Sequence, residues 1–318
     1  MTSEHEHRVL SMNDATNAPA ISTLNARHST NNLLRLFFDL FKLRIGLVIG
    51  FTAVAGFAVT PGPETSGWQV LVLALAVTLA SAAAGAFNQY VERDLDVRMR
   101  RTRRRAFVTG RLHAGPAWLA AIVAIAAAGV LLAYVAFNTS TAVYTFLGAF
   151  TYAVVYTVWL KRRTPWNIVI GGLAGSFAVL AGSAAVSPDS MGAMPLAFAF
   201  ILFLWTPPHF WSLAIACHDD YAAAGVPMLP VVVGDARAAR AVFAGASLLV
   251  AASMIPLALG MGIVYFAGAA VGGAWLVAKA FALMRTPDRR TAMASFHASL
   301  IQLTLLLVAA IADASLHA

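Results

Sequence analysis

The sequence is poor in cysteine and in charged residues. Cys217 is the one cysteine, which excludes a disulfide framework and a metal site built from several cysteines. Only 11% of the 318 residues are charged, whereas an average soluble domain has about 25%. The 13 prolines and 23 glycines are ordinary numbers and exclude a collagen-like chain. A chain with so few charges has little polar material for a surface that faces water.

Apolar residues are correspondingly abundant. They make up 60% of the chain, and the mean hydropathy is +0.75. A membrane-spanning helix needs about 20 mainly apolar residues, and no alternating pattern indicates a β-barrel. We therefore predict an all-α polytopic membrane bundle of nine transmembrane helices. They are expected near residues 36–60, 68–90, 116–137, 141–160, 167–187, 192–215, 238–257, 260–283 and 293–314.

The basic residues predict how this bundle is oriented. All 22 Lys and Arg residues fall before or at the start of the first segment, or around the connections after segments two, four, six and eight. Because basic loops remain in the cytoplasm, we expect a plasma-membrane protein with a cytoplasmic N-terminus and an extracytoplasmic C-terminus. Residues 1–35 contain no apolar run and are expected to form a disordered cytoplasmic tail, so that 36–318 is the membrane domain.

An acidic stripe ends the second segment. Asn88, Glu92 and Asp96 are spaced i, i+4 and i+8, so on one helix they share a face, whereas Asp94 points away. Amide and carboxylate oxygens are ligands that hold Mg²⁺ together with substrate phosphates. The alternative is a helix end with solvated, salt-bridged charges.

Arginines follow this stripe closely. Six lie between residues 98 and 105, and Lys161, Arg162 and Arg163 follow the fourth segment. Guanidinium groups pair with phosphate oxygens at two points, so carboxylates, metal and arginines together suit a diphosphate. The alternative is that these cations set topology and bind anionic lipid headgroups.

A third polar stretch follows the sixth segment. Asp219 and Asp220 could hold a second metal or close the site. Pro207 and Pro208 predict an interruption of the segment beside His209, and a broken helix at membrane depth lines a cavity or is buried in protein. His209 could bind a metal or haem iron or carry protons; the alternative is a hydrogen bond to a neighbouring helix.

These stretches together resemble a known family, the protoheme IX farnesyltransferases of the UbiA-type intramembrane prenyltransferases. The family pattern would have Lys-Pro-Arg at positions 42–44, and this chain has Leu43 in place of the proline. The resemblance is carried by three ordered motifs: Asn88-x-x-x-Glu92-Arg93-Asp94-x-Asp96-x-x-Met99-x-Arg101-Thr102-x-x-Arg105, Tyr156-Thr157-x-x-Leu160-Lys161-Arg162, and Pro207-Pro208-His209-Phe210-Trp211 leading to Asp220-Tyr221.

The resemblance implies a reaction and its partners. Farnesyl diphosphate would donate its farnesyl group to a vinyl group of haem B, with addition of water, giving haem O for terminal oxidase assembly and diphosphate. The active site would open to the cytoplasmic face, and Mg²⁺ would be the cofactor. The bilayer is the expected environment, no nucleic acid is expected, and product could pass to haem A synthase or a terminal oxidase.

The resemblance also implies roles for individual residues. The metal ligands would be Asn88, Glu92, Asp96 and Asp220. The groups acting on the leaving diphosphate would be Arg101, Arg105, Lys161 and Arg162, together with the metal site formed by Asn88, Glu92 and Asp96. The substrate-binding residues would be Arg93, His209, Trp211, Asp219, Asp220 and Tyr221.

Two other classes of function compete with this interpretation. One is prenyl transfer to a quinone precursor or a chlorophyllide, against which the Pro-Pro-His-Phe-Trp stretch and the Glu-Arg-Asp form of the first motif argue. The other is a transporter or channel, but these place ionisable residues near the membrane midplane. Here the charges gather at one predicted face, which favours the prenyltransferase.

Overall fold

The structure is a computed structural model that describes residues 36–62, 66–189 and 191–316. The chain divides into two compact units, residues 1–40 and 41–318. In the first unit only residues 36–40 are described, and they are helical. The expected tail, residues 1–35, lies outside the described residues, so the division at 35/36 stays a prediction.

The second unit is a bundle of helices, with no strand in its described ranges. Eight helical stretches there are long and apolar enough to cross a membrane, and the 16-residue α2 (Leu43–Ala58) is a shorter apolar helix. The all-α membrane bundle is thereby confirmed. The eight stretches are α3 (Gly67–Val91), α5 (Pro116–Ala136), α6 (Thr139–Phe150) with the π-helix η1 (Thr151–Leu160), α7 (Asn167–Gly171) with α8 (Leu173–Val186), α9 (Ala193–Ala216), α12 (Asp235–Ala252) with α13 (Ile255–Ala258), α14 (Ile263–Arg285) and α15 (Arg289–Leu316).

Helix boundaries follow local capping chemistry. Ser66 and Gln69 form a reciprocal capping box at the start of α3. It satisfies backbone N–H groups of the first turn, which have no carbonyl partner within the helix. The Asn138 side chain accepts a hydrogen bond from the Thr141 N–H at the start of α6. Pro116 is the first residue of α5, where its missing N–H costs nothing.

Small residues let the helices approach closely. A Cβ at Gly182 of α8 would collide with the Ala53 carbonyl oxygen of α2, and one at Gly56 of α2 would collide with the Val179 carbonyl oxygen of α8. Close backbone approach at small residues is a general means of packing helices in membranes.

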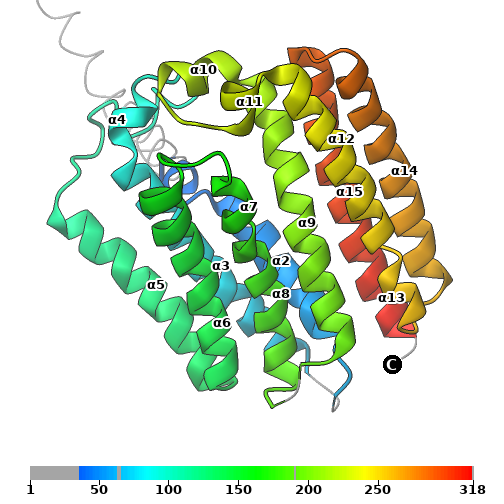
Figure 1. The fold of residues 1–318 in the computed structure, drawn as a ribbon. Coiled ribbons are helices and arrows are strands. Elements are labelled where there is room, and N and C mark those ends of the chain that lie inside the picture. Colours follow the sequence, from blue (N-terminus) through cyan, green and yellow to red (C-terminus); the bar gives the residue numbers. More distant parts are fainter. Residues whose placement is uncertain (1–35, 63–65, 190, 317–318) are drawn as a thin grey trace, which may run out of the picture. The chain divides into compact units, whose positions relative to one another are not determined.

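The connections that carry the polar motifs lie at one end of the bundle. Figure 1 shows three short helices at this end, which is also the end where α14 turns into α15. They are α4 (Arg93–Asp96), α10 (His218–Ala223) and α11 (Leu229–Val233). This arrangement brings together loops that are more than 100 residues apart in sequence.

The predicted interruption of the sixth span is wrong. Helix α9 runs through Pro207 and Pro208 without a break. Hydroxyl groups on both sides donate to the helix backbone: Thr206 to the Leu202 carbonyl at 3.0 Å and Ser212 to the Pro208 carbonyl at 2.7 Å. Neither is a carbonyl that the prolines leave without a helix N–H partner, since those belong to the residues four positions earlier, Phe203 and Leu204.

Candidate active site

Two buried carboxylates lie where α3 ends. Glu92 caps α3 and is 1% exposed, and Asp96, at the end of α4, is 2% exposed. The Asp96 N–H donates to the Glu92 carbonyl at 2.8 Å, and the Glu92 N–H donates to the Asn88 carbonyl at 3.0 Å. The i, i+4 bonding thus continues past the end of α3, and all three side chains of the predicted stripe are buried.

Each carboxylate is held by a cation from elsewhere in the site. The Lys161 ammonium lies 2.6 Å from both Glu92 carboxylate oxygens, donates a hydrogen bond to Oε2 and leaves Oε1 without one. Arg105 Nη1 donates to both carboxylate oxygens of Asp96, at 2.6 and 2.8 Å. Buried charges are tolerated only when paired in this way.

Asn88 completes the polar cluster. Its amide nitrogen donates to the Thr157 hydroxyl at 3.1 Å, and its amide oxygen accepts a hydrogen bond from Lys42 Nζ at 2.8 Å. Lys42 also donates to the Tyr152 hydroxyl at 3.2 Å. Its backbone is left-handed, with φ of 46°, which is strained for a lysine and is typical of positions that the surrounding structure holds in place.

The charges of the cluster act on one another. Burial lowers the pKa of the Lys42 ammonium to about 7. The charges of Arg105 and Lys161 act in the same direction, and Glu92 and Asp96 oppose them. The five groups therefore share one electrostatic environment.

The π-helix η1 presents Tyr152 and Thr157 of this cluster, and Lys161 follows it. Thr157 donates to the carbonyl of Tyr152, five residues earlier, at 2.8 Å. The rings of Tyr152 and Tyr156 stack at 5.8 Å between centroids. π-Helical segments often occur at functional sites.

A second, more exposed layer surrounds this cluster. Asp94 and Arg162 form a two-point ion pair at 2.7 and 2.8 Å, and their side chains are 55% and 39% exposed. Hydrogen bonding to Arg162 lowers the pKa of Asp94 despite its partial burial. Asp94 thus lies outside the buried group, as its spacing indicated, and in this structure Arg162 pairs with Asp94.

Asp220 fastens the arginine-rich loop to α10. Its carboxylate accepts hydrogen bonds from the backbone N–H groups of Arg100 and Arg101, both at 3.2 Å, and from the Arg100 side chain at 3.3 Å. These bonds lower the pKa of Asp220 although burial acts against them. Asp219 is exposed and lies 3.6 Å from Arg100.

The remaining predicted residues lie on α4, α9 and α10. His209 is stacked between Trp205 and Phe296, and its Nδ1 lies 2.7 Å from the Ser299 hydroxyl of α15. This is the hydrogen bond to a neighbouring helix that was the alternative for this residue. Three other predicted residues have separate surroundings. Arg93 lies over the Tyr90 ring, and the buried Nε1 of Trp211 has no hydrogen bond. Tyr221 is buried near Leu95 and Met99.

Sequence reasoning missed Lys42, Tyr152 and Thr157 as members of the site. The chain has only three lysines, and two of them, Lys42 and Lys161, bond to the predicted stripe. The scarcity of lysine was the available signal for Lys42. Nothing in the sequence marks Tyr152, because the π-helix brings it to the cluster.

The donor set fits a magnesium ion. In the described part of the chain no three His, Cys, Asp or Glu side chains converge, so the candidates are Glu92, Asp96 and the Asn88 amide. Mg²⁺ is commonly held by one or two carboxylates together with substrate phosphates. Both Glu92 oxygens are in contact with the Lys161 ammonium, so a metal bound there would share this carboxylate with Lys161 or displace it.

Comparison with known proteins identifies the family. Residues 49–306 match the UbiA prenyltransferase family. The chain is 53% identical to protoheme IX farnesyltransferase 2 of Paramagnetospirillum magneticum over 280 residues, which are 88% of this chain and 97% of that protein. It is 40% identical to the protoheme IX farnesyltransferase of Gloeobacter violaceus over 279 residues, 86% of this chain and 90% of that protein.

Solved structures show the same fold at low sequence identity. A digeranylgeranylglyceryl phosphate synthase superposes with a TM-score of 0.71 at 17% identity, covering 88% of this chain and 98% of that one. A UbiA homologue from Archaeoglobus fulgidus, bound to GPP and Mg²⁺, gives a TM-score of 0.68 at 17% identity, covering 88% and 99%. The chain therefore belongs to the UbiA prenyltransferase family and, within it, to the protoheme IX farnesyltransferases.

Proposed function

We propose that this chain transfers the farnesyl group of farnesyl diphosphate to a vinyl carbon of haem B and releases diphosphate. Water adds to the resulting side chain, which gives the hydroxyethylfarnesyl group of haem O. The observation that carries the proposal is the buried cluster in which Lys161 holds Glu92, Arg105 holds Asp96 and Lys42 holds Asn88. Oxygen ligands and cations are thereby assembled before substrate arrives.

The leaving group determines what this cluster has to do. Breaking the allylic carbon–oxygen bond puts negative charge on the diphosphate, and fixed cations lower the energy of that charge. Mg²⁺ held by Asn88, Glu92 and Asp96 would add positive charge there. Asp220 does not form a three-carboxylate group with Glu92 and Asp96, and its proposed role is to hold the arginine-rich loop. Lys161, Arg105 and Lys42 then turn from their present acceptors to diphosphate oxygens.

The outer residues act at the mouth of the same site. Arg101 and Arg162 are proposed to meet the terminal phosphate, with Arg93, Asp219 and Tyr221 around the entrance. The charge of Arg101 is permanent, because a guanidinium does not lose its proton in proteins. Arg162 would have to exchange the Asp94 carboxylate for phosphate.

Haem is proposed to lie beside α9, where His209 Nε2 and the Trp211 indole N–H would contact it. An apolar pocket protects the farnesyl cation from water until the vinyl group attacks. The haem B vinyl is the proposed acceptor; a quinone precursor is the competing acceptor to test.

The site end of the bundle is proposed to face the cytoplasm of a plasma-membrane protein. The basic residues of the described connections support this orientation through the positive-inside rule. Delivery of haem O to haem A synthase or a terminal oxidase would follow from the insolubility of the product in water.

The test uses purified protein in detergent with haem B, farnesyl diphosphate and Mg²⁺. The expected product has the mass of haem O, forms together with one diphosphate, and is lost when EDTA removes the metal. Parallel reactions replace haem B by a hydroxybenzoate-type quinone precursor. Farnesylation of that acceptor in place of haem B would overturn the proposed acceptor, and release of no diphosphate with either would overturn the proposed reaction.

A further inference from the structure

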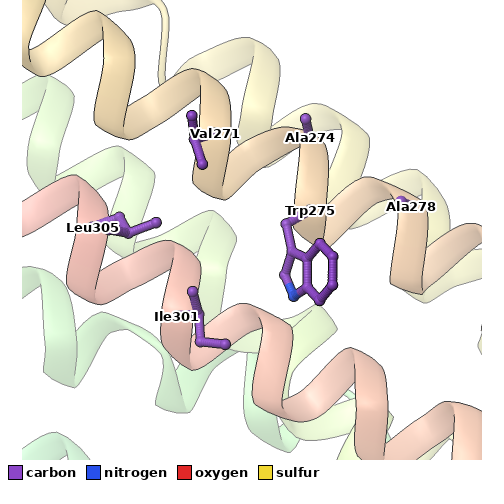
Figure 2. Close-up of a pocket in the computed structure, with 6 residues that line it drawn as sticks. All are labelled: Val271, Ala274, Trp275, Ala278, Ile301 and Leu305. Carbon is purple, nitrogen blue, oxygen red and sulfur yellow. The ribbon is translucent and has the colours of Figure 1, made fainter.

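The outer face between α14 and α15 carries an apolar groove of about 660 Å³, within the range of ligand-binding pockets. Figure 2 shows its walls, in which the α14 positions are spaced as one helix face. Among the six side chains drawn in Figure 2, the indole nitrogen of Trp275 is the only polar atom. The lining residues are Val271, Ala274, Trp275 and Ala278 of α14 and Ile301 and Leu305 of α15.

The groove is open to the outside of the bundle. Val271 is 64% exposed, Trp275 is 49% exposed and Ile301 is 48% exposed. These residues face away from the Glu92–Lys161 cluster, since α14 packs mainly on α12 and α15. The groove is therefore separate from the proposed active site.

A cluster of cations stands at one end of this groove. Lys279 follows Ala278 directly, and its Nζ lies 4.4 Å from the centroid of the Trp275 ring. Arg285 ends α14, and Arg289 and Arg290 begin α15, all three exposed.

The acidic residue of this turn is already engaged. Asp288 accepts a hydrogen bond from the Thr291 N–H at 2.8 Å and thereby caps α15. The single negative charge of Asp288 and the four positive charges of Lys279 and the three arginines give this end of the groove a net charge of +3. The groove is thus apolar along its length and positive at its mouth.

We propose that the groove binds an anionic phospholipid, with one acyl chain along α14 and the headgroup phosphate at Lys279 and Arg285. The dimensions agree with one leaflet of a bilayer. Fourteen residues separate Val271 from Arg285, which is about 21 Å along a helix, and half of a bilayer with its headgroups is roughly 20–22 Å thick. The chain end would then lie near Val271, close to the membrane midplane.

The charge distribution favours this occupant over a second copy of the chain. Two copies related by an axis along the membrane normal would bring identical basic ends to the same depth, where like charges repel. A zwitterionic lipid would gain the same apolar contacts but less from the cations. Each Lys or Arg near the headgroups favours an anionic lipid by roughly fivefold.

Tryptophan quenching measures the proposal directly. The protein is placed in phosphatidylcholine vesicles in which a rising fraction is replaced by dibrominated phosphatidylglycerol or dibrominated phosphatidylcholine. The fluorescence of Trp275 is obtained as the difference between the unchanged chain and Trp275→Phe. We expect half-maximal quenching at a mole fraction at least roughly fivefold lower for the anionic lipid.

Charge-matched variants identify the source of the preference. The double variant Lys279→Gln with Arg285→Gln should make the half-maximal mole fractions of the two lipids equal. The control double variant, Arg104→Gln with Arg111→Gln, removes two exposed cations outside α14 and α15 and should leave the two mole fractions different. Ala274→Phe, which fills the groove, should weaken quenching by both lipids.

Two results would overturn the proposal. Equal mole fractions for the two lipids in the unchanged chain would show that the cations do not select a headgroup. Absence of quenching by either lipid would show that another protein surface covers the groove.

Discussion

The ammonium of Lys42 donates a hydrogen bond to the amide oxygen of Asn88, 46 residues further along the chain. The contact joins the start of α2 to the end of α3 at the centre of the polar cluster. It also occupies the oxygen through which Asn88 would bind Mg²⁺. We propose that Lys42 turns from this oxygen to a diphosphate when Asn88 binds Mg²⁺.

We expect Lys42→Met to weaken farnesyl diphosphate binding by about tenfold or more, because a charge-assisted hydrogen bond contributes about 1.5–3 kcal/mol. The KM for farnesyl diphosphate at saturating Mg²⁺ measures the effect. Lys42→Arg should recover part of the affinity, since the charge is retained. Arg240→Met, which removes an exposed cation of α12, is the control, and equal KM values for Lys42→Met and this control would contradict the role.

The Glu92–Lys161 pair should contribute far more to the free energy of unfolding than the Asp94–Arg162 pair. Removing one partner of a buried ion pair costs about 3–5 kcal/mol because the other charge is left unpaired. Glu92→Gln and Lys161→Met should each destabilise the fold by about that much, and the double variant by less than their sum. Unfolding in detergent by heat or denaturant gives the three values.

The exposed Asp94–Arg162 pair supplies the comparison, because its two residues lie within two positions of Glu92 and Lys161. Asp94→Asn and Arg162→Gln should each cost under about 1 kcal/mol, since water screens exposed ion pairs. Strict additivity for the buried pair, or an equally large coupling for the exposed pair, would show that burial does not govern these contacts.

The spanning helices could be predicted because local chemistry determines their ends. The segment expected near 116–137 is α5 at Pro116–Ala136, and the segment expected near 192–215 is α9 at Ala193–Ala216. Turn residues and apolar runs carry this information within a few positions. The continuity of α9 through its prolines could not be predicted, because proline removes a helix hydrogen bond and the packing of neighbouring helices decides whether the helix breaks there.

The candidate site was only partly predictable for a related reason. The spacing of Asn88, Glu92 and Asp96 is local and indicated that they act together. The pairing of Glu92 with Lys161 joins residues 69 positions apart, and neither the left-handed backbone of Lys42 nor the π-helix before Lys161 has a recognisable sequence pattern. Long-range partners arise from the packing of helices, which a single sequence does not display.

Close packing of α2 on α8 should make Gly182 intolerant of a methyl group. A Cβ there would collide with the Ala53 carbonyl oxygen, and forcing extra volume into a packed interface costs typically 1–3 kcal/mol. Gly182→Ala should lower the midpoint of thermal unfolding in detergent. Gly67→Ala, where a Cβ would meet nothing within 4 Å, should leave the midpoint unchanged; a similar loss in both variants would place the effect outside the α2–α8 contact.

The proposed orientation can be tested with single cysteines. Cys217 is replaced by serine first, although burial raises the pKa of its thiol and slows its reaction with maleimides. Arg111→Cys then places a thiol before α5 at the basic end, and Thr139→Cys places one at the start of α6, at the other end of α5. If the basic connections are cytoplasmic, a membrane-impermeant maleimide labels Thr139→Cys in intact cells and Arg111→Cys only after the membrane is opened. The reverse pattern would place the candidate site on the outer face and would require haem and farnesyl diphosphate to reach it from there.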